Sequence, residues 1–295
     1  MFRTRLAPTP SGYLHSGNAL NFIITWLWAR KENGSIRLRI DDLDSPRAKP
    51  EYLEDIFKTL EWLGLDWDEG PQTPDEQKRL YTQTLRAARY EELLNTLVNG
   101  NHTFACQCSR KELAGFEQYP GACINKHIAF TEPETAWRAL TPDNTIVTIN
   151  DFYNGALTVD LYGQMRHFVV RRRDGIPAYQ IASLCDDIDY GINLIVRGHD
   201  LLTSTAAQIF LAGLTGLKEF PKTTFYHHPL LTDENGMKLS KSAGSSSLKS
   251  WREIYTQPDT FYQMLSEKFN WAEKINSAQE LLTCVKQGMQ VLPPG

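Results

Sequence analysis

The sequence predicts an α/β protein built around a parallel sheet. Two patterns carry this prediction: a strand, a helix and a second strand open the chain, and a β-branched strand, a helix and a further strand follow one another over 192–227. The composition agrees, because 41% hydrophobic and 22% charged residues are typical of a globular protein. A chain of 295 residues can also bury a large core without disulfide bonds.

The elements of the first hundred residues follow from apolar periodicity and from the glycines and prolines that interrupt it. The first helix shows apolar residues at helical spacing from about Gly17 to Lys31, and Gly34 ends it. The predicted elements are a strand over 2–7, a helix from about 17 to 31, a strand over 36–40, and helices over 51–63 and 75–99.

The segment 104–146 has a different character, because it holds three of the five cysteines and few periodic stretches. We interpret it as part of an insertion into the sheet fold. Beyond it, Asn154-Gly155 is a good turn signal between two short strands. The remaining predicted elements are a strand pair over 147–159, a strand over 168–171, a helix from 179, a strand over 192–196, a helix over 203–214, a strand over 223–227 and a helical tail over 250–289.

Charge, hydropathy and cysteine count restrict the class of protein. The net charge of −4 does not favour non-specific binding to nucleic acid, so an RNA partner needs a local basic patch. The apolar run over 19–29 is interrupted by Asn21 and Thr25 and is too short to span a bilayer. We therefore expect a cytoplasmic protein with no membrane partner. Five cysteines, an odd number, argue against a disulfide framework and leave metal binding or plain burial.

The loop between the first strand and the first helix has the features of a phosphate site. Gly12 and Gly17 allow the backbone to approach a ligand closely, and the helix that begins after Gly17 presents free N–H groups. His15 is placed to donate a hydrogen bond to a developing phosphate charge. An isolated His-x-Gly sequence is more often an ordinary tight loop with a surface histidine.

A second loop, K-L-S-K-S over 238–242, carries two lysines and two serines. Lys238 and Lys241 can clamp a triphosphate and neutralise its charge in a transition state. Such a loop by itself is more often a solvated run of charges. Together with the first loop, however, the phosphate-binding interpretation is favoured, because two phosphate-directed loops then lie near opposite ends of one α/β sheet.

In this order and separation, the two loops resemble the HIGH and KMSKS motifs of class I aminoacyl-tRNA synthetases. Three further segments resemble the glutamyl/glutaminyl subclass: R-I-D-D-L-D-S-P-R over 39–47, R-R-D-G-I-P-A-Y-Q over 172–180 and I-V-R-G-H-D-L over 195–201. The similarity covers roughly residues 3–245. It implies a Rossmann-type parallel sheet that activates an amino acid with ATP, and Mg²⁺ bound with the ATP.

The resemblance assigns roles to individual residues. Glutamate has two carboxylates and one ammonium group, so its site needs two cations and one anion, for which Arg5, Arg197 and Asp41 are the candidates. The implied glutamate-binding residues are Arg5, Leu6, Ala7, Pro8, Thr9, Asp41, Tyr179 and Arg197. The implied ATP-binding residues are His15, Gly17, Asn18 and Lys241, and the implied catalytic residues are His15, Lys238 and Lys241.

Cys106, Cys108 and Cys123, with Tyr119 between them, form a further motif. Thiolates favour tetrahedral zinc, and a phenolate can supply a fourth ligand. The spacing alone leaves zinc and three ordinary free cysteines equally plausible. The C-x-C…Y-x3-C pattern resembles the zinc site of the glutamyl-queuosine tRNA(Asp) synthetases, which implies one structural Zn²⁺ held by these four residues.

The tail points to the same subfamily, since 53 residues follow Ser242, too few for a further domain of typical size. We therefore expect no anticodon-binding domain. The resemblance implies that glutamate is activated and transferred to the queuosine base of tRNA(Asp). Asp41, Gln180 and Asn18 depart from the glutamyl pattern and keep open a related adenylating enzyme with another amino acid or acceptor. A non-catalytic tRNA-binding module is a third interpretation.

We expect the following organisation. Residues 1–245 form the catalytic domain, interrupted by a zinc-bearing, acceptor-binding insertion over 101–165, and residues 246–295 form a short helical segment of the stem-contact type. The expected RNA surface is a local patch made by Arg166, His167, Arg171, Arg172 and Arg173. We expect a monomer.

Overall fold

The computed structural model describes residues 1–43, 48–231, 247–271 and 273–291. The chain opens with β1 (Arg3–Leu6), α1 (Ser16–Lys31) and β2 (Ser35–Leu38). β1 and β2 pair in parallel, with Thr4 opposite Ile36, so the predicted strand–helix–strand unit is confirmed. α1 has buried residues on all sides, among them Leu20, Ile23 and Leu27, because it is enclosed between the strands and the C-terminal helices.

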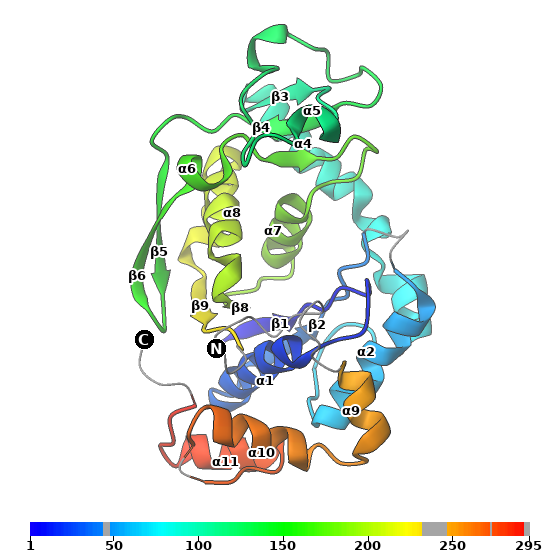
Figure 1. Ribbon diagram of the computed structural model, residues 1–295, viewed down its shortest axis with the longest axis vertical. Helices are drawn as coiled ribbons and strands as arrows, with labels where there is room; N and C mark the ends of the chain where they lie inside the picture. The colour runs from blue at the N-terminus through cyan, green and yellow to red at the C-terminus, as the bar shows by residue number, and fades with distance from the viewer. Residues whose placement is uncertain (44–47, 232–246, 272, 292–295) are drawn as a thin grey trace.

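β1 and β2 lie beside a four-stranded sheet from segments between residues 146 and 228, and the two together form the central sheet (Figure 1). β8 (Leu194–Gly198) pairs in parallel with β9 (Thr224–His228), and β9 pairs in parallel with β5 (Ile146–Asp151). β1 lies beside β8, where the Asn193 amide donates to the Arg3 carbonyl at 2.9 Å. The Asn154-Gly155 turn lies between β5 and β6 (Gly155–Asp160), which pair antiparallel as predicted.

Two helices, α7 (Tyr179–Asp189) and α8 (Leu202–Thr215), pack on this sheet, and a short 3₁₀ turn (His199–Leu201) leads into α8. A second such turn (Phe220–Lys222) precedes β9. α2 (Pro50–Leu63) begins with a proline at its first position and ends at Gly64, whose φ of 73° suits a helix C-terminus.

The single helix predicted over 75–99 is wrong. The chain forms α3 (Pro74–Glu76), a π-helical turn (Gln77–Tyr81), a 3₁₀ turn (Gln83–Arg86) and α4 (Ala87–Asn99). The interruption lets two glutamines reach Asp42: the Gln77 side chain and the Gln83 amide each donate to its carboxylate at 2.8 Å. Apolar periodicity does not reveal such a break, because it arises from polar contacts with a distant loop.

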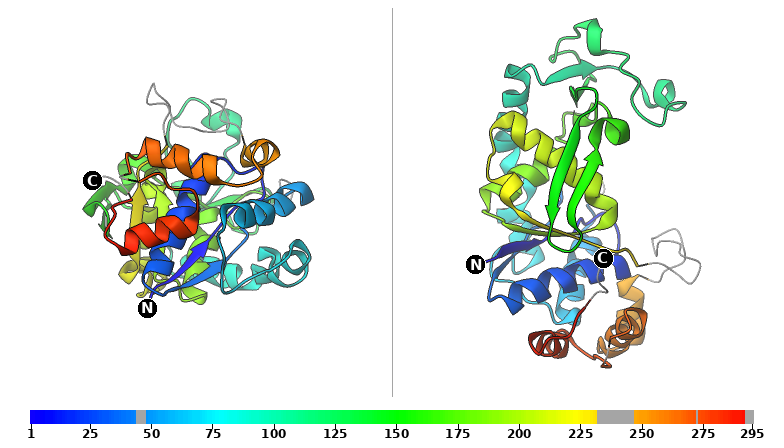
Figure 2. Two further views of the ribbon diagram at one scale, coloured as in Figure 1. Left: turned by 90° about the horizontal axis from the view of Figure 1, so that it is seen from below. Right: turned by 90° about the vertical axis from the view of Figure 1, so that its left-hand side faces the viewer.

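The insertion contains a second sheet, which the sequence did not predict (Figure 2, right). β3 (Thr103–Cys106) pairs antiparallel with β4 (Ala136–Ala139), which pairs antiparallel with β7 (Val169–Arg171). The strand predicted at 168–171 is therefore present, but in this second sheet. Short helical pieces complete the region: α5 (Arg110–Leu113), a 3₁₀ turn (Ile124–Lys126) and α6 (Leu161–Met165).

The tail is helical, as predicted, and packs against the N-terminal unit. It contains α9 (Leu248–Ile254), α10 (Asp259–Lys268) and α11 (Ala278–Lys286). Figure 1 shows α10 and α11 beneath α1, at the end of the molecule opposite the insertion. Phe261, Leu265 and Leu281 share one buried cluster with Leu6 of β1. A second cluster joins α4, α7, α8 and the strands around them. In the described part of the chain, no helix is long and apolar enough to cross a membrane.

Candidate active site

A cavity of about 440 Å³ opens at the carboxyl ends of the parallel strands, beside the N-terminus of α1. This is the usual ligand position in open α/β sheets. Of the residues predicted for the site, those that line the cavity are Arg5, Ala7, Pro8, Thr9, His15, Gly17, Asn18, Asp41, Tyr179 and Arg197. Leu6 instead buries its side chain in the apolar core. Lys238 and Lys241 lie outside the described residues.

His15 caps the N-terminus of α1 in a reciprocal arrangement with Asn18. The imidazole Nδ1 accepts from the Gly17 amide at 3.1 Å, and the Asn18 side chain accepts from the His15 amide at 3.1 Å. Because Nδ1 accepts, the neutral ring carries its proton on Nε2. The amides of Gly17, Asn18 and Ala19 are used within the cap, so what this end of the helix offers a phosphate group is the positive end of the helix dipole and an oriented imidazole.

Beneath the cavity, a buried carboxylate joins three arginines. Asp187 accepts from Arg5 Nε at 3.0 Å and from Arg39 Nη1 at 2.7 Å, and its second oxygen lies 3.8 Å from Arg197 Nη2. Burial alone would raise the pKa of Asp187, but the three guanidinium groups outweigh it and hold the pKa below its usual value. Asp187 was not among the residues predicted from the sequence. The pattern that could have revealed it is an acidic residue at an inward position of a helix with an apolar face.

Asp41 lies on the cavity wall and is already paired. Arg39 donates to its two carboxylate oxygens from Nε at 2.7 Å and from Nη2 at 3.2 Å. Burial raises the pKa of Asp41, although Arg39 opposes the shift. A ligand ammonium group at this wall would favour the carboxylate form and would meet a fixed anion. Arg39 belongs to the motif that marked this segment, yet only the structure assigns it the role of orienting Asp41.

Arg197 is the cation whose hydrogen bonds are least complete. Its Nη1 donates to Thr205 Oγ1 at 3.0 Å and to Gln208 Oε1 at 2.6 Å. Its Nε and Nη2 have no hydrogen-bond partner among the described residues, although the side chain is only 2% exposed. Burial lowers the pKa of Arg197. A buried guanidinium edge with unused donors in a cavity wall is suited to a carboxylate, which such an edge can bind through two hydrogen bonds.

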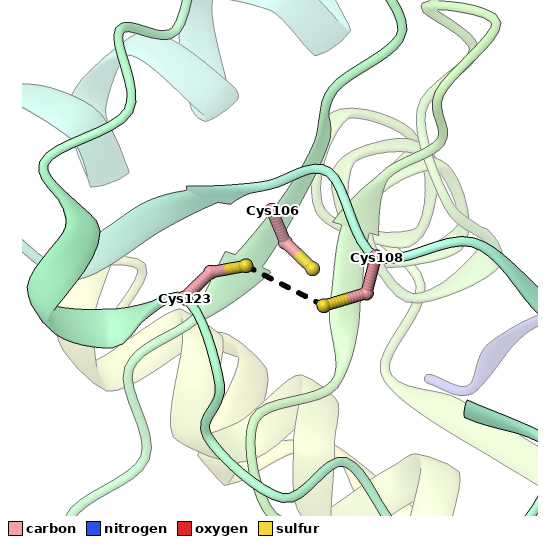
Figure 3. A group of neighbouring side chains, drawn as sticks. All are labelled: Cys106, Cys108 and Cys123. Atoms are coloured by element: carbon pink, nitrogen blue, oxygen red, sulfur yellow. Dashed lines mark hydrogen bonds between the residues drawn. The ribbon is translucent and has the colours of Figure 1, made fainter. Parts of the chain in front are cut away.

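The three cysteines of the insertion come together (Figure 3). The sulfur atoms of Cys106, Cys108 and Cys123 all lie within 4.8 Å of one another, and those of Cys108 and Cys123 are 3.4 Å apart. Tyr119 lies beside them, with its hydroxyl accepting from the Cys123 amide at 2.8 Å. Burial would raise the pKa of Cys123, but hydrogen bonds, first of all with Tyr119, lower it to about 7. The donor set fits a tetrahedral thiophilic metal.

The predicted RNA patch is not one open basic surface. His167 is buried, and its Nδ1 accepts from the Thr141 amide at 3.2 Å. Arg172 pairs with Asp174 at 2.5 Å and Arg173 pairs with Glu134 at 3.0 Å. The Arg171 guanidinium lies over the Trp137 ring, 4.6 Å from its centre. Neighbouring acids neutralise much of the charge that the sequence places together.

The chain resembles known proteins along most of its length. The family model for the catalytic domain of class I tRNA synthetases (E and Q) matches residues 1–283. A glutamyl-Q tRNA(Asp) synthetase of Nitratidesulfovibrio vulgaris is 38% identical over 268 residues, which cover 85% of this chain and 81% of that protein. A glutamate–tRNA ligase of Anaeromyxobacter sp. is 33% identical over 95% of this chain, but the match spans only 59% of the ligase.

Solved structures agree with these relatives. A glutamate tRNA ligase from Elizabethkingia meningosepticum, determined in complex with its amino acid, superposes with a TM-score of 0.76 and 25% identity. The match covers 95% of this chain and 64% of the ligase. These comparisons and the sequence motifs indicate the same family, and the position of the cavity agrees with it.

Proposed function

The chain belongs to the class I tRNA synthetases of the glutamyl and glutaminyl type, and from this premise we propose that it activates glutamate with ATP and transfers it to the queuosine base of tRNA(Asp). One observation supports glutamate as the amino acid. Arg197, with unpaired donors, and Asp41, with a fixed carboxylate, both line the cavity. Similarity to glutamyl-Q tRNA(Asp) synthetases supports the acceptor half.

The charges of the cavity suit glutamate. In the buried group, Arg5, Arg39 and Arg197 carry three positive charges, while Asp41 and Asp187 carry two negative charges. The remaining positive charge is compensated by one carboxylate of the ligand. Asp41 receives its ammonium group, and Tyr179, at the N-terminus of α7, lines the same cavity. The second carboxylate then points toward the N-terminus of α1, where the phosphates of ATP would lie.

Activation joins these two sites. An oxygen of the glutamate α-carboxylate attacks the α-phosphorus of ATP, the bond from that phosphorus to the bridging oxygen breaks, and pyrophosphate leaves with the negative charge. His15 Nε2–H and the positive end of the α1 dipole stabilise the charge on the phosphate. Mg²⁺ accompanies the phosphates of ATP and neutralises their charge. A hydroxyl of the modified base then attacks the anhydride carbonyl and releases AMP.

One experiment tests the proposal. The protein is incubated with ATP, radiolabelled glutamate and tRNA(Asp), either with queuosine or unmodified. We expect label on the queuosine-containing tRNA alone, and release of that label when the modified nucleoside is removed. Equal labelling of both tRNAs, or labelling of neither, would contradict the acceptor assignment. Glutamate-dependent exchange between ATP and pyrophosphate tests the activation step separately.

A second candidate is a related enzyme that activates glutamate or another amino acid for a different acceptor. Two observations favour it: glutamate–tRNA ligases are among the relatives, and Asp41 has one methylene fewer than the glutamate of the glutamyl pattern. Exchange measured across all amino acids, and labelling of tRNA(Glu), distinguish it. Strict glutamate dependence with no label on tRNA(Glu) would exclude this candidate.

We also propose that Cys106, Cys108, Tyr119 and Cys123 hold one structural Zn²⁺. The mutual approach of three sulfur atoms, with the Tyr119 hydroxyl beside them, supports the site. A bound ion would tie the loop after β3 to the segment that carries Cys123 and so stabilise the insertion.

Metal analysis of the purified protein tests this proposal. We expect about one zinc ion per chain in the wild type and in the control Cys284→Ser, whose cysteine lies in α11. We expect little zinc in Cys108→Ser, which removes the most accessible of the three sulfur atoms. Zinc retained at the full level in Cys108→Ser would contradict the site.

A further inference from the structure

A buried chain of hydrogen bonds runs from Asp151, beside the β5–β6 turn, to Nη1 of Arg197. Asp151, the last residue of β5, lies 2.7 Å from His227 Nδ1. His227 Nε2 lies 2.8 Å from Thr205 Oγ1, and Thr205 Oγ1 lies 3.0 Å from Arg197 Nη1. All four residues are at least 96% buried, and they come from β5, β9, α8 and β8.

The negative charge of Asp151 determines which atom donates in each hydrogen bond of this chain. Asp151 accepts from the His227 amide at 2.8 Å and from the amides of Tyr153 and Asn154 at 3.0 and 2.8 Å. So many donors require a carboxylate, which in turn requires a proton on His227 Nδ1. The neutral ring then accepts at Nε2, so the Thr205 hydroxyl directs its proton to Nε2 at 2.8 Å and not to the Leu201 carbonyl at 3.2 Å.

The same reasoning fixes Arg197. With its proton directed to His227, Thr205 Oγ1 presents its lone pairs to Arg197 Nη1. The second hydrogen of Nη1 goes to Gln208 Oε1 at 2.6 Å, so both hydrogens of this nitrogen are used. Arg197 lines the cavity, and its Nε and Nη2 are left without a hydrogen-bond partner among the described residues, with the Asp187 carboxylate 3.8 Å from Nη2. The edge formed by these two nitrogens has the geometry of a bidentate carboxylate contact.

We propose that Asp151, His227 and Thr205 are positioning residues that orient Arg197 so that its Nε–Nη2 edge receives the carboxylate of the amino acid. The inference rests on the proposed function, because it explains how the site distinguishes a carboxylate from other side-chain ends. A carboxamide has one oxygen that can accept from this edge. Its NH₂ group is a donor and would face the second N–H donor of Arg197, so binding of a carboxamide is disfavoured.

The test compares variants of two threonines on α8. Thr205→Val removes the hydroxyl with little change of volume, and Thr205→Ser retains it. Thr215→Val is the matched control, because both hydroxyl oxygens lie close to the carbonyl oxygen four residues earlier, at 3.2 and 2.8 Å, but Thr205 also lies beside His227 and Arg197. The measurements are the KM for glutamate, the KM for ATP and kcat in ATP–pyrophosphate exchange.

We expect Thr205→Val to raise the KM for glutamate about tenfold, the effect of one lost hydrogen bond to a charged group, with the KM for ATP and kcat within about twofold. Thr205→Ser is expected to restore the wild-type KM, and Thr215→Val to leave all three constants unchanged. An unchanged KM for glutamate in Thr205→Val, or parallel losses in all three constants, would overturn the inference.

A spectroscopic measurement separates this inference from the proposed function. Nitrogen NMR of ¹⁵N-labelled histidine, with the signal assigned by its loss in His227→Gln, reports which ring nitrogen carries the proton. We expect the Nδ1–H form in the wild type and a changed Nε2 shift in Thr205→Val. A wild type in the Nε2–H form overturns the chain of hydrogen bonds, whatever the activity. A wild type with the Nδ1–H form but no glutamate-dependent exchange overturns the proposed function instead.

Discussion

Arg197 shows how a single buried charge can prepare a binding site. Removing a guanidinium group from water is costly unless each donor finds an acceptor, and here two nitrogens have none among the described residues. The carboxylate of a ligand would provide the missing acceptors. Binding then gains both the direct contact and relief from the cost of the unpaired donors.

Arg197→Lys tests this role. Lysine keeps the charge but offers a point donor on a flexible stem, so the two-pronged contact is lost. We expect the KM for glutamate to rise by roughly 10- to 100-fold, as for about 1.5–3 kcal/mol of charged hydrogen bonding, and the KM for ATP to change little. Exchange kinetics measure both constants. Equal changes in the two would show that the residue acts on the whole cavity and not on the amino acid.

Asp187 is the residue on which the arginine cluster depends. Asp187→Asn removes the buried carboxylate and leaves three guanidinium groups without their shared counterion. We expect a loss of about 3–5 kcal/mol in the free energy of unfolding, measured by urea denaturation. The control is Asp189→Asn on the same helix, whose partly exposed ion pairs with Arg86 and Arg89 contribute less than about 1 kcal/mol.

The same cluster gives a pH dependence with a defined sign. The pKa of Asp187 is lower in the folded state than its ordinary value of about 3.9. Its stabilisation is therefore complete above that value and is lost as the pH falls through the folded-state pKa. We expect the free energy of unfolding of the wild type to fall below about pH 4, and that of Asp187→Asn to fall less steeply over the same range. Parallel pH curves would contradict this account.

At the scale of the element, the N-terminus of α1 explains one departure from the family pattern. Asn18 stands where the HIGH motif has its second histidine, and its side chain accepts from the His15 amide. A short amide acceptor at the third helical position completes a capping box, which fixes where the helix begins. His15 is oriented by the same arrangement, so the start of the helix and the proposed phosphate site depend on each other.

Asn18→Ala separates the two effects. We expect a loss of about 0.5–2 kcal/mol in the free energy of unfolding, the range measured for capping residues. We also expect kcat for exchange to fall, since the His15 backbone loses an acceptor that holds it. Asn21→Ala, one turn further along α1, changes a residue that also lines the cavity but lies outside the capping box. Asn21 has its own contact with His228, so the capping role is judged on Asn18→Ala alone, and a loss of stability below about 0.5 kcal/mol in that variant would contradict it.

At the scale of the whole molecule, the C-terminal helices form part of the catalytic core. α11 packs on α1, and Leu281, Phe261 and Tyr262 are buried in the cluster that contains β1 and α2. The helix that carries His15 is therefore held from below by residues some 260 positions later in the chain. The position of the proposed phosphate site depends on this packing.

Leu281→Ala measures that dependence. The side chain is fully buried, so we expect a loss of about 2–5 kcal/mol in the free energy of unfolding, from lost transfer energy and a residual cavity. Thr283→Ala, at an exposed position of the same helix, is the control and should change stability by less than about 0.5 kcal/mol. If Leu281→Ala unfolds in a separate earlier transition, the tail is an independent unit.

The sequence by itself determined the family, the parallel strand–helix–strand units and the residues around the cavity, because these depend on local periodicity and on short motifs. It identified Arg197 and Asp41, and it grouped three cysteines whose spacing allowed two interpretations. Each motif is recognised from residues that are close together in the sequence, so the local order of residue types is enough to identify it.

Only the tertiary structure decided which distant groups meet. The strands β3 and β4, the broken helix over 75–99, the Asp187 cluster and the link from Asp151 to Arg197 all rest on contacts between segments far apart in the chain. The pattern of a helix can mark a charged residue as facing inward, but it does not identify the partner, because the cost of burial is offset by whichever group folding brings beside it. The partners of Arg197, and hence the edge that it offers to a ligand, follow from packing and not from the motif.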